Sequence, residues 1–325
     1  MKVLITGVAG FIGFHVAKKF IANKIKVIGV DNLNSYYDVG LKKDRIKNIK
    51  KTNKNYFKFY HKDINNIFFL KKLFSKNKFE AVIHLAAQPG VRYSFKNPKS
   101  YFDNNLNGFV NVLEILRLFN VKHFIFASSS SVYGNSHKVR SSEVDSCDKP
   151  LNLYAATKKS NEILGYSYSK IYNIKMTALR FFTVYGPWGR PDMAYFKFVD
   201  SIFKRKKIDI YNHGKHKRDF SYIDQIVDGI FAIFSYRKKN KKPFNIYNLA
   251  SGRPFKLLDF ISMIEKIIGH KSKKNYLNVQ KGDILETAAN INKFYHDFKI
   301  KQKLTLEQGL KEFINWYKNY YNKKI

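Results

Sequence analysis

A glycine-rich turn between a predicted strand and a predicted helix limits the possible folds of this chain more than any other feature. The β-rich run Lys2–Thr6 precedes the turn, and the helical period Ile12–Asn23 follows it. The turn itself contributes Gly7, Gly10 and Gly13. Glycines at this spacing allow a tight turn, a close approach of the backbone to a pyrophosphate, and close packing of helix on strand. The pattern predicts a β-α-β unit with an anion at the N-terminus of its helix.

The end of the next predicted strand, Lys26–Asp31, indicates which anion this is. Asp31 stands eighteen residues beyond Gly13. A carboxylate at that place accepts hydrogen bonds from both ribose hydroxyls of a dinucleotide and repels a 2′-phosphate. We therefore predict that the cofactor is NAD and not NADP.

Strand-like and helix-like runs alternate over the first 180 residues. Further strands are expected at Phe57–His61, Ala81–Leu85, Phe124–Ser128 and Met176–Arg180, and further helices at Phe69–Lys76, Tyr101–Phe119 and Leu153–Tyr172. This alternation predicts an α/β fold with a doubly wound parallel (Rossmann) sheet. We expect an NAD-binding domain over residues 1–180. Residues 181–325 should form a smaller C-terminal α/β substrate-binding domain, with chain crossings between the two and a helix near Thr305–Tyr321.

The composition restricts the compartment and the partners. A single cysteine, Cys147, excludes an internal disulfide and fits a reducing compartment, so we expect a cytoplasmic protein. We expect no membrane partner, because no apolar run approaches the ~18 residues of a membrane span. The net charge of +36 comes mainly from lysines scattered over almost every predicted element, with ten arginines among the 60 basic residues. We interpret it as a solvated surface and expect no nucleic acid partner.

Tyr154 and Lys158 stand one helical turn apart and share a helix face. Asn152 is a candidate N-cap for that helix. A nearby ammonium and a positive nicotinamide ring favour the phenolate, which lets the tyrosine take a proton from a substrate hydroxyl. The four serines Ser128–Ser131 follow the fifth predicted strand, at the edge where a doubly wound sheet builds its site. An amphipathic helix with a chance pair is the alternative, and the serine cluster counts against it.

Further motifs continue the pattern along the chain. They are His84-Leu85-Ala86-Ala87, Asp103-Asn104-Asn105, Arg180-Phe181-Phe182-Thr183-Val184-Tyr185-Gly186-Pro187 and Arg218-Asp219-Phe220. With the glycine turn, the serines and the Tyr154/Lys158 pair, these residues resemble the extended short-chain dehydrogenase/reductase family, and within it the nucleotide-sugar 4-epimerases. The resemblance implies a homodimer packed through the helices around Tyr101–Phe119 and Leu153–Tyr172.

The same resemblance implies roles for individual residues. Tyr154 would be the catalytic base, Lys158 its partner and a ribose ligand, and Ser129 the hydroxyl that bridges tyrosine and substrate. Together with Tyr154 and Lys158, the NAD contacts would be Gly7, Gly10, Phe11, Ile12, Gly13, Asp31, Asn32, Asp63, Ile64, Leu85, Ala86, Ala87, Gln88, Asn104 and Phe182.

Four segments look more specifically like UDP-glucuronate 4-epimerases: residues 10–15, 34–38, 88–94 and 186–193. Thr183 stands where the galactose-type enzymes have an asparagine, and the resemblance implies that it helps to hold the sugar carboxylate. Arg190 and Arg218 match diphosphate ligands, for which a bidentate guanidinium is well suited. Asp283 matches the residue that binds the uridine ribose. The remaining substrate contacts would be Arg92, Ser129, Ser131 and Tyr154.

The implied reaction is reversible oxidation at sugar C4, rotation of the 4-keto sugar, and reduction from the opposite face. We expect interconversion of UDP-glucuronate and UDP-galacturonate, supplying surface polysaccharide synthesis. A UDP-glucose or UDP-N-acetylglucosamine 4-epimerase is the alternative. A decarboxylase fits less well, because decarboxylases and dehydratases of this family carry an acidic residue where Ser130 and Ser131 stand.

Two alternative functions are that of a non-catalytic nucleotide-binding protein and that of a nucleic-acid-binding protein. The complete set of Tyr154, Lys158 and Ser129 argues against the first, and the lack of an arginine-rich helix or an RNA-binding signature argues against the second. We expect no metal, because His213 and His216 lie in a predicted hairpin turn without a third ligand nearby.

Overall fold

A seven-stranded parallel sheet forms the centre of the molecule in the computed structural model, which describes residues 1–135, 140–239, 242–280, 282–301 and 303–323. The strand order is β10-β6-β5-β4-β1-β2-β3. Their bounds are β1 Lys2–Thr6, β2 Lys26–Asp31, β3 Phe57–His61, β4 Ala81–His84, β5 His123–Ser129, β6 Lys175–Phe181 and β10 Phe244–Leu249. The predicted Rossmann sheet is confirmed. Its strand order reverses between β1 and β4, the place where doubly wound sheets bind ligands.

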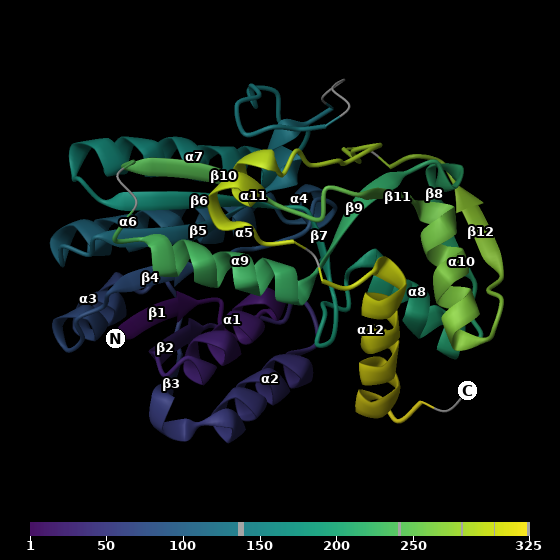
Figure 1. The fold of residues 1–325 in the computed structure, drawn as a ribbon, viewed down its shortest axis with the longest axis horizontal. Coiled ribbons are helices and arrows are strands. Elements are labelled where there is room, and N and C mark those ends of the chain that lie inside the picture. Colours follow the sequence, from purple (N-terminus) through teal and green to yellow (C-terminus); the bar gives the residue numbers. More distant parts are fainter. Residues whose placement is uncertain (136–139, 240–241, 281, 302, 324–325) are drawn as a thin grey trace.

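Helices cover both faces of the sheet (Figure 1). On one side lie α1 (Phe11–Ala22), α2 (Val39–Thr52) and α9 (Ile223–Tyr236); on the other lie α3 (Ile67–Ser75), α6 (Gly108–Leu118) and α7 (Leu153–Ile171). Alternate residues of β1 therefore enter different cores: Val3 and Ile5 pack toward α1, and Leu4 packs toward α6. Because both faces are covered, the buried strands read as apolar runs.

The expected single helix over Tyr101–Phe119 is wrong in detail. The chain forms a short α5 (Pro98–Tyr101), a π-helical turn η2 (Phe102–Asn107) and then α6. The buried Asn105 explains the irregular turn, since its side chain accepts from the backbone N–H of Gln88 (2.7 Å) and donates to the carbonyl of Gln88 (3.1 Å). Bulges of this kind often occur at functional sites.

The second half of the chain contributes smaller sheets at the carboxyl edge of the large one. A three-stranded sheet has the order β11-β9-β7, and β12 pairs with β8. The bounds are β7 Thr183–Tyr185, β8 Ile208–Tyr211, β9 Lys217–Tyr222, β11 Pro254–Lys256 and β12 Lys274–Leu277. The hairpin expected around His213 and His216 is wrong, because β8 and β9 pair with other strands.

The other helices of this half are α8 (Ala194–Phe203), α10 (Leu257–Ile268), α11 (Asn292–Phe298) and α12 (Leu306–Tyr320). A capping box starts α12, in which Thr305 and Gln308 satisfy each other's backbone N–H groups. The division of the chain at residue 180 remains a prediction. One crossing is clear, because β10 returns from the second half to the edge of the large sheet beside β6.

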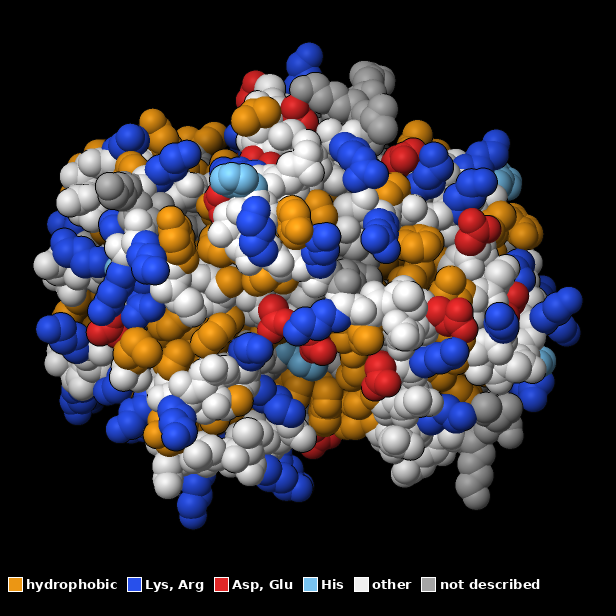
Figure 2. All heavy atoms as spheres, viewed as in Figure 1, with side chains coloured by type: hydrophobic (Ala, Val, Ile, Leu, Met, Phe, Trp, Pro, Cys, Tyr) orange, Lys and Arg blue, Asp and Glu red, His pale blue; other side chains and the backbone are white. Residues whose placement is uncertain are grey.

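Lysine and arginine side chains are scattered over the face shown in Figure 2 and do not gather on one element. Among the residues that the structure describes, no helix has the length and apolar character needed to cross a lipid bilayer.

Candidate active site

A cleft of about 770 Å³ opens at the carboxyl ends of the parallel strands. This volume is in the range of cofactor and ligand sites. The expected site residues from Gly7 to Asp283 line it, with one exception. Gln88 is buried, and its backbone is held by Asn105, so it supports the wall of the cleft from behind.

The glycine turn leaves no room for side chains. Gly7 has φ +70°, and a Cβ there would lie 2.6 Å from the backbone nitrogen of Ala86. A Cβ on Gly13 would collide with the carbonyl oxygen of Gly7. The N-terminus of α1 consequently faces the cleft with bare backbone, as binding of a pyrophosphate requires.

Asp31 lies at the end of β2 beside this turn. Its carboxylate accepts from the backbone N–H of Ala9 (3.0 Å) and of Leu33 (2.8 Å). Burial raises the pKa of Asp31, and these bonds together with the nearby Lys42 and Arg45 act in the opposite direction. Its neighbour Asn32 donates to Asp63 (2.8 Å), so three polar side chains form one rim of the cleft.

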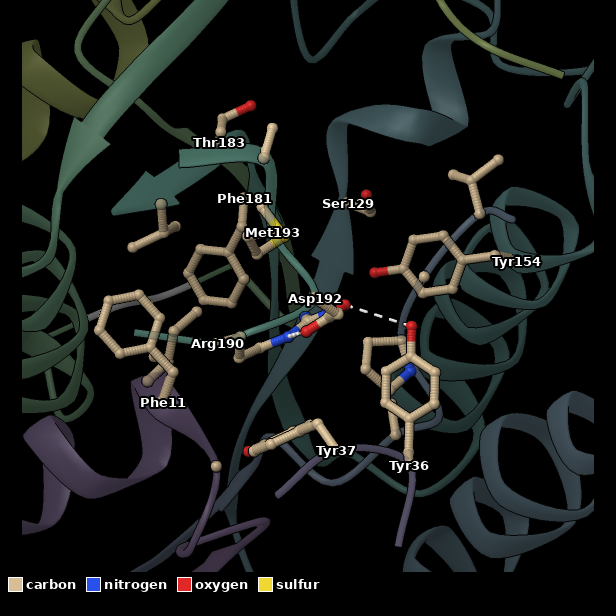
Figure 3. Close-up of a pocket in the computed structure, with 18 of the residues that line it drawn as sticks. Phe11, Tyr36, Tyr37, Ser129, Tyr154, Phe181, Thr183, Arg190, Asp192 and Met193 are labelled. Carbon is tan, nitrogen blue, oxygen red and sulfur yellow. Dashed lines mark hydrogen bonds and ion pairs between the residues drawn. The ribbon is translucent and has the colours of Figure 1, made fainter. Parts of the chain in front are cut away.

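Tyr154 projects from the first turn of α7 toward Ser129 at the end of β5 (Figure 3). The helix begins where the sequence predicts, because the Asn152 side chain accepts from Ala155 N–H (2.9 Å). Burial raises the pKa of Tyr154, whereas the hydrogen bond with Ser129 and the charge of Arg190 lower it. Ser129 also accepts from the backbone N–H of Ser131 (3.1 Å), which holds its hydroxyl in place.

Lys158 lies one turn further along α7, fully enclosed. Its ammonium donates to the carbonyl oxygen of Ala127 (2.9 Å), and burial lowers its pKa to about 8. For Tyr154 the effect of burial outweighs the Ser129 bond and the Arg190 charge, so its pKa in the protein alone lies above that of free tyrosine. The positive nicotinamide ring of a bound cofactor is the further charge that the phenolate would need.

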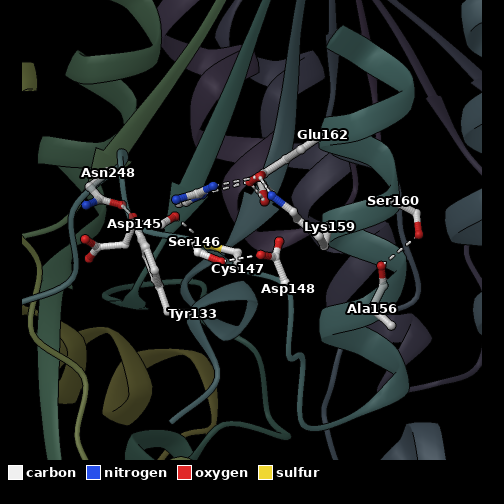
Figure 4. Close-up of polar contacts among 12 residues, drawn as sticks. Tyr133, Asp145, Ser146, Cys147, Asp148, Ala156, Lys159, Ser160, Glu162 and Asn248 are labelled. Carbon is white, nitrogen blue, oxygen red and sulfur yellow. Dashed lines mark hydrogen bonds and ion pairs between the residues drawn. The ribbon is translucent and has the colours of Figure 1, made fainter. Parts of the chain in front are cut away.

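A buried network supports the serine loop from behind (Figure 4). Glu162, one turn beyond Lys158, accepts from Ser128 Oγ (2.6 Å) and forms a bidentate pair with Arg180 (2.8 Å for both bonds). The Arg180 guanidinium also lies 4.7 Å from the centre of the Tyr133 ring. This network fixes the end of β5 against α7, and so fixes Ser129 relative to Tyr154.

Arg190 enters the cleft from the loop between β7 and α8. Its Nε donates to Asp192 (3.0 Å), and Asp192 also accepts from the Tyr36 hydroxyl (3.2 Å) (Figure 3). Although burial acts to raise it, pairing with Arg190 holds the pKa of Asp192 below its ordinary value. Figure 3 shows the side chains of Arg190 and Asp192 in the same part of the cleft as Tyr154.

Arg218 lies at the opposite end, on β9. Burial lowers its pKa to about 10, and its Nη1 donates to the carbonyl oxygen of Leu285 (3.0 Å). Arg92 forms an ion pair with Asp283 (3.5 Å) and stacks over Tyr211 at 4.3 Å. Thr183 pairs with Phe220 of the neighbouring β9, so it lies next to the strand that carries Arg218.

The sequence did not assign several residues that line the cleft: Asn34, Tyr36, Tyr37, Lys42, Asp192, Tyr211 and His216. Two signals were available. Residues 34–38 and 186–193 resemble segments of UDP-glucuronate 4-epimerases, but the resemblance assigns no contact to Tyr36 or Asp192.

Comparison with known proteins agrees with this geometry. Residues 3–250 match the profile of the NAD dependent epimerase/dehydratase family. The chain is 46% identical to Protein CapI of Staphylococcus aureus, over 99% of this chain and 100% of that protein. It is 40% identical to a probable UDP-glucuronate 4-epimerase of Rhizobium meliloti, with coverage of 99% and 98%.

The fold also resembles a solved enzyme. The UDP-glucuronic acid 4-epimerase of Bacillus cereus, crystallised with UDP-glucuronic acid and NAD, superposes with a TM-score of 0.91. The two chains are 34% identical, and the match covers 99% of this chain and 100% of that one.

Proposed function

The chain belongs to the NAD-dependent epimerase/dehydratase family, and we propose that it is a 4-epimerase that interconverts UDP-glucuronate and UDP-galacturonate. One observation carries this proposal: Tyr154 and Ser129 share a cleft with the glycine turn on one side and with Arg190 and Thr183 on the other. The names of the similar proteins from Rhizobium meliloti and Bacillus cereus support the same substrate.

NAD fits the cofactor end of the cleft. The bare backbone at Gly7 and Gly13 suits a pyrophosphate, and Asp31 is placed for ribose hydroxyls. Bound there, NAD supplies reversible hydride transfer at C4 of the sugar. Lys158 would hold the nicotinamide ribose, and Asn32, Asp63, Ile64, Asn104 and Phe182 would contact the remaining cofactor surface.

Tyr154 acts as the base and acid of the reaction. It removes the proton of the 4-hydroxyl, with Ser129 bridging the two oxygens, and returns a proton after the 4-keto sugar has turned over. A 4-keto uronate is a β-keto acid that loses carbon dioxide when its carboxylate aligns with the carbonyl π system. Hydroxyls at Thr183 and Ser131 would hold the carboxylate out of that alignment.

The charged residues divide between the two ends of the substrate. Arg218 and Arg92, near Asp283, suit the diphosphate and the uridine ribose. The sequence resemblance predicts that Arg190 also binds the diphosphate. Because it lines the same part of the cleft as Tyr154, a contact with the sugar is favoured, where a guanidinium complements the uronate carboxylate.

The alternatives fit the cleft less well. A neutral UDP-hexose would leave Arg190 without an anionic partner from the substrate. A decarboxylase or dehydratase would need an acidic residue within Ser128–Ser131, and none is present. A non-catalytic protein would not need Tyr154 and Ser129 in contact.

The assay that tests the function uses the purified protein without added cofactor. It is incubated separately with UDP-glucuronate, UDP-galacturonate, UDP-glucose, UDP-galactose and UDP-N-acetylglucosamine, and the products are identified. We expect interconversion of the two uronates and little turnover of the neutral sugars. Equal rates on UDP-glucose and UDP-glucuronate would remove the uronate assignment and leave the epimerase assignment standing.

The proposal extends to assembly and to place in the cell. Ile163 and Tyr166 lie one turn apart on α7 and are 57% and 51% exposed, which suits the predicted homodimer interface. Sedimentation at micromolar concentration should give a dimer that Ile163→Lys weakens; a wild-type monomer would contradict the interface.

We also propose a cytoplasmic enzyme that supplies uronates for surface polysaccharides.

A further inference from the structure

Arg45 on α2 is fully buried between the glycine turn and the loop that precedes Arg190. Its Nη1 donates to the carbonyl oxygen of Ala9 in the glycine turn (2.9 Å) and to the Tyr37 hydroxyl (2.7 Å). Nε and Nη2 donate to the carbonyl oxygen of Trp188 (3.2 and 2.6 Å), and Nη2 also donates to that of Gly189 (2.9 Å). A guanidinium has five N–H donors, so these five bonds use all of them.

The loop that Arg45 holds has an unusual backbone. Trp188 has φ +61°, a region that side-chain-bearing residues rarely adopt without external support. His15 on α1 provides a further bond, from Nε2 to the carbonyl oxygen of Pro187 (2.9 Å). Burial lowers the pKa of His15 to about 3, so its ring is neutral, and Nε2 must carry the proton because a carbonyl only accepts. Three consecutive carbonyls are thus bound by side chains of the Rossmann part.

The next residue along this loop is Arg190. Its guanidinium is steered by Asp192, which is itself held by Tyr36, but its starting point is the backbone of Gly189. A Cβ at Gly189 would meet the Tyr195 hydroxyl, so this backbone packs closely against α8. Contacts from both sides therefore determine where Arg190 enters the cleft.

We propose that Arg45 is a positioning residue for Arg190 and that it ties the loop facing the anionic sugar to the turn facing the cofactor. The inference rests on the proposed function, because it takes Arg190 as a contact to the UDP-sugar. A lysine could not replace Arg45, since an ammonium has three donors and no planar fork. All five bonds go to neutral oxygens, so Arg45 acts here through the directions of its N–H groups and not through an ion pair.

The test uses Arg45→Lys in the NAD-containing enzyme. This change keeps a positive charge near Asp31 and removes the fork that spans Ala9, Trp188 and Gly189. We expect KM for UDP-glucuronate to rise about 10- to 100-fold and kcat to fall, because a displacement of ~1 Å can cost ~10²-fold. NAD content and the affinity for UDP, which lacks the sugar, should stay within about threefold of the wild type.

Arg237→Lys is the matched control. Arg237 is also buried, but it donates to Phe234 and Glu80 far from the cleft. It should lose stability in the same way as Arg45→Lys and keep its KM and kcat. If both variants change stability alone, or if Arg45→Lys loses NAD in step with the sugar, the inference is wrong.

A double-mutant cycle with Arg190→Met shows whether Arg45 acts through Arg190. We expect the double variant to be no slower on UDP-glucuronate than Arg190→Met alone; additive losses would refute the coupling.

If Arg45→Lys does not fold, His15→Phe removes a bond to the same loop and should raise KM in the same direction by a smaller factor. A wild type that uses a neutral UDP-sugar would overturn the proposed substrate, and the cycle on that sugar would still test Arg45.

Discussion

The cofactor end and the sugar end of the cleft are built in different ways. At the cofactor end, one β-α-β unit provides bare backbone at Gly7 and Gly13 and a carboxylate at Asp31. At the sugar end, charged and hydroxyl side chains come from loops, short strands and one helix between Tyr36 and Asp283, and some are held in ion pairs such as Arg190–Asp192.

This difference separates two kinds of function. A site made of backbone depends on close approach, and a change there should affect every substrate alike. A site made of paired side chains depends on which charges face the ligand, so a change there should alter the choice of substrate. Tyr154 stands where the two ends meet, and its loss should have the largest effect.

Tyr154→Phe should fold normally, keep NAD, and lose activity by several orders of magnitude, since a general base contributes ~10² to 10⁴ in rate. Turnover of UDP-glucuronate, with circular dichroism and NAD content as controls, measures this. Near-normal turnover would show that another residue is the base and that Tyr154 does not act between the cofactor end and the sugar end.

Asp31→Ala should weaken NAD binding by roughly 10- to 150-fold, because charge-assisted hydrogen bonds contribute ~1.5–3 kcal/mol. Titration of the cofactor-stripped protein with NAD gives the affinity. The ratio of rates on UDP-glucuronate and UDP-glucose, at saturating NAD, should stay unchanged if the two ends are separate. Bound NADP in the wild type would contradict the role of Asp31.

Thr183→Ala should reduce the preference for uronates about tenfold, the value of one such hydrogen bond, and release carbon dioxide as the carboxylate swings free. Thr183→Ser, which keeps the hydroxyl, is the control. If the alanine variant slows all UDP-sugars equally, then Thr183 only supports the backbone of the cleft, and the sugar end is less selective than we infer.

The pH dependence gives the smallest expected effect. Burial lowers the pKa of Lys158 to about 8, so the ammonium is charged below that pH and neutral above it. If the phenolate of Tyr154 needs this charge, kcat should fall about fivefold from pH 8 to pH 9, the change in the protonated fraction of such a group. The decline should be the same for both uronates. A flat kcat up to pH 9 would show that the cofactor alone stabilises the phenolate.

Local patterns predicted the cofactor end well. The turn and its two flanking elements were placed within one residue, because a buried parallel strand and a helix that starts in a glycine-rich turn each have a strong short-range signature. The pattern was less informative where tertiary contacts override it. The π-helical turn at Phe102–Asn107 exists because the Asn105 side chain binds the Gln88 backbone, and no period in the sequence announces such a bond.

The fold class followed from the alternation of strand-like and helix-like runs over the first 180 residues, and the cofactor turn and the Tyr154/Lys158 pair followed from short stretches of chain. Three features became visible only in the folded molecule: Gln88 lies behind the wall of the cleft, Asp192 and Tyr36 hold Arg190, and Arg45 joins Ala9 to Trp188. Backbone sterics and helix periods act between neighbours in the chain, whereas the buried Arg45 guanidinium finds an acceptor at the Trp188 carbonyl, 143 residues away.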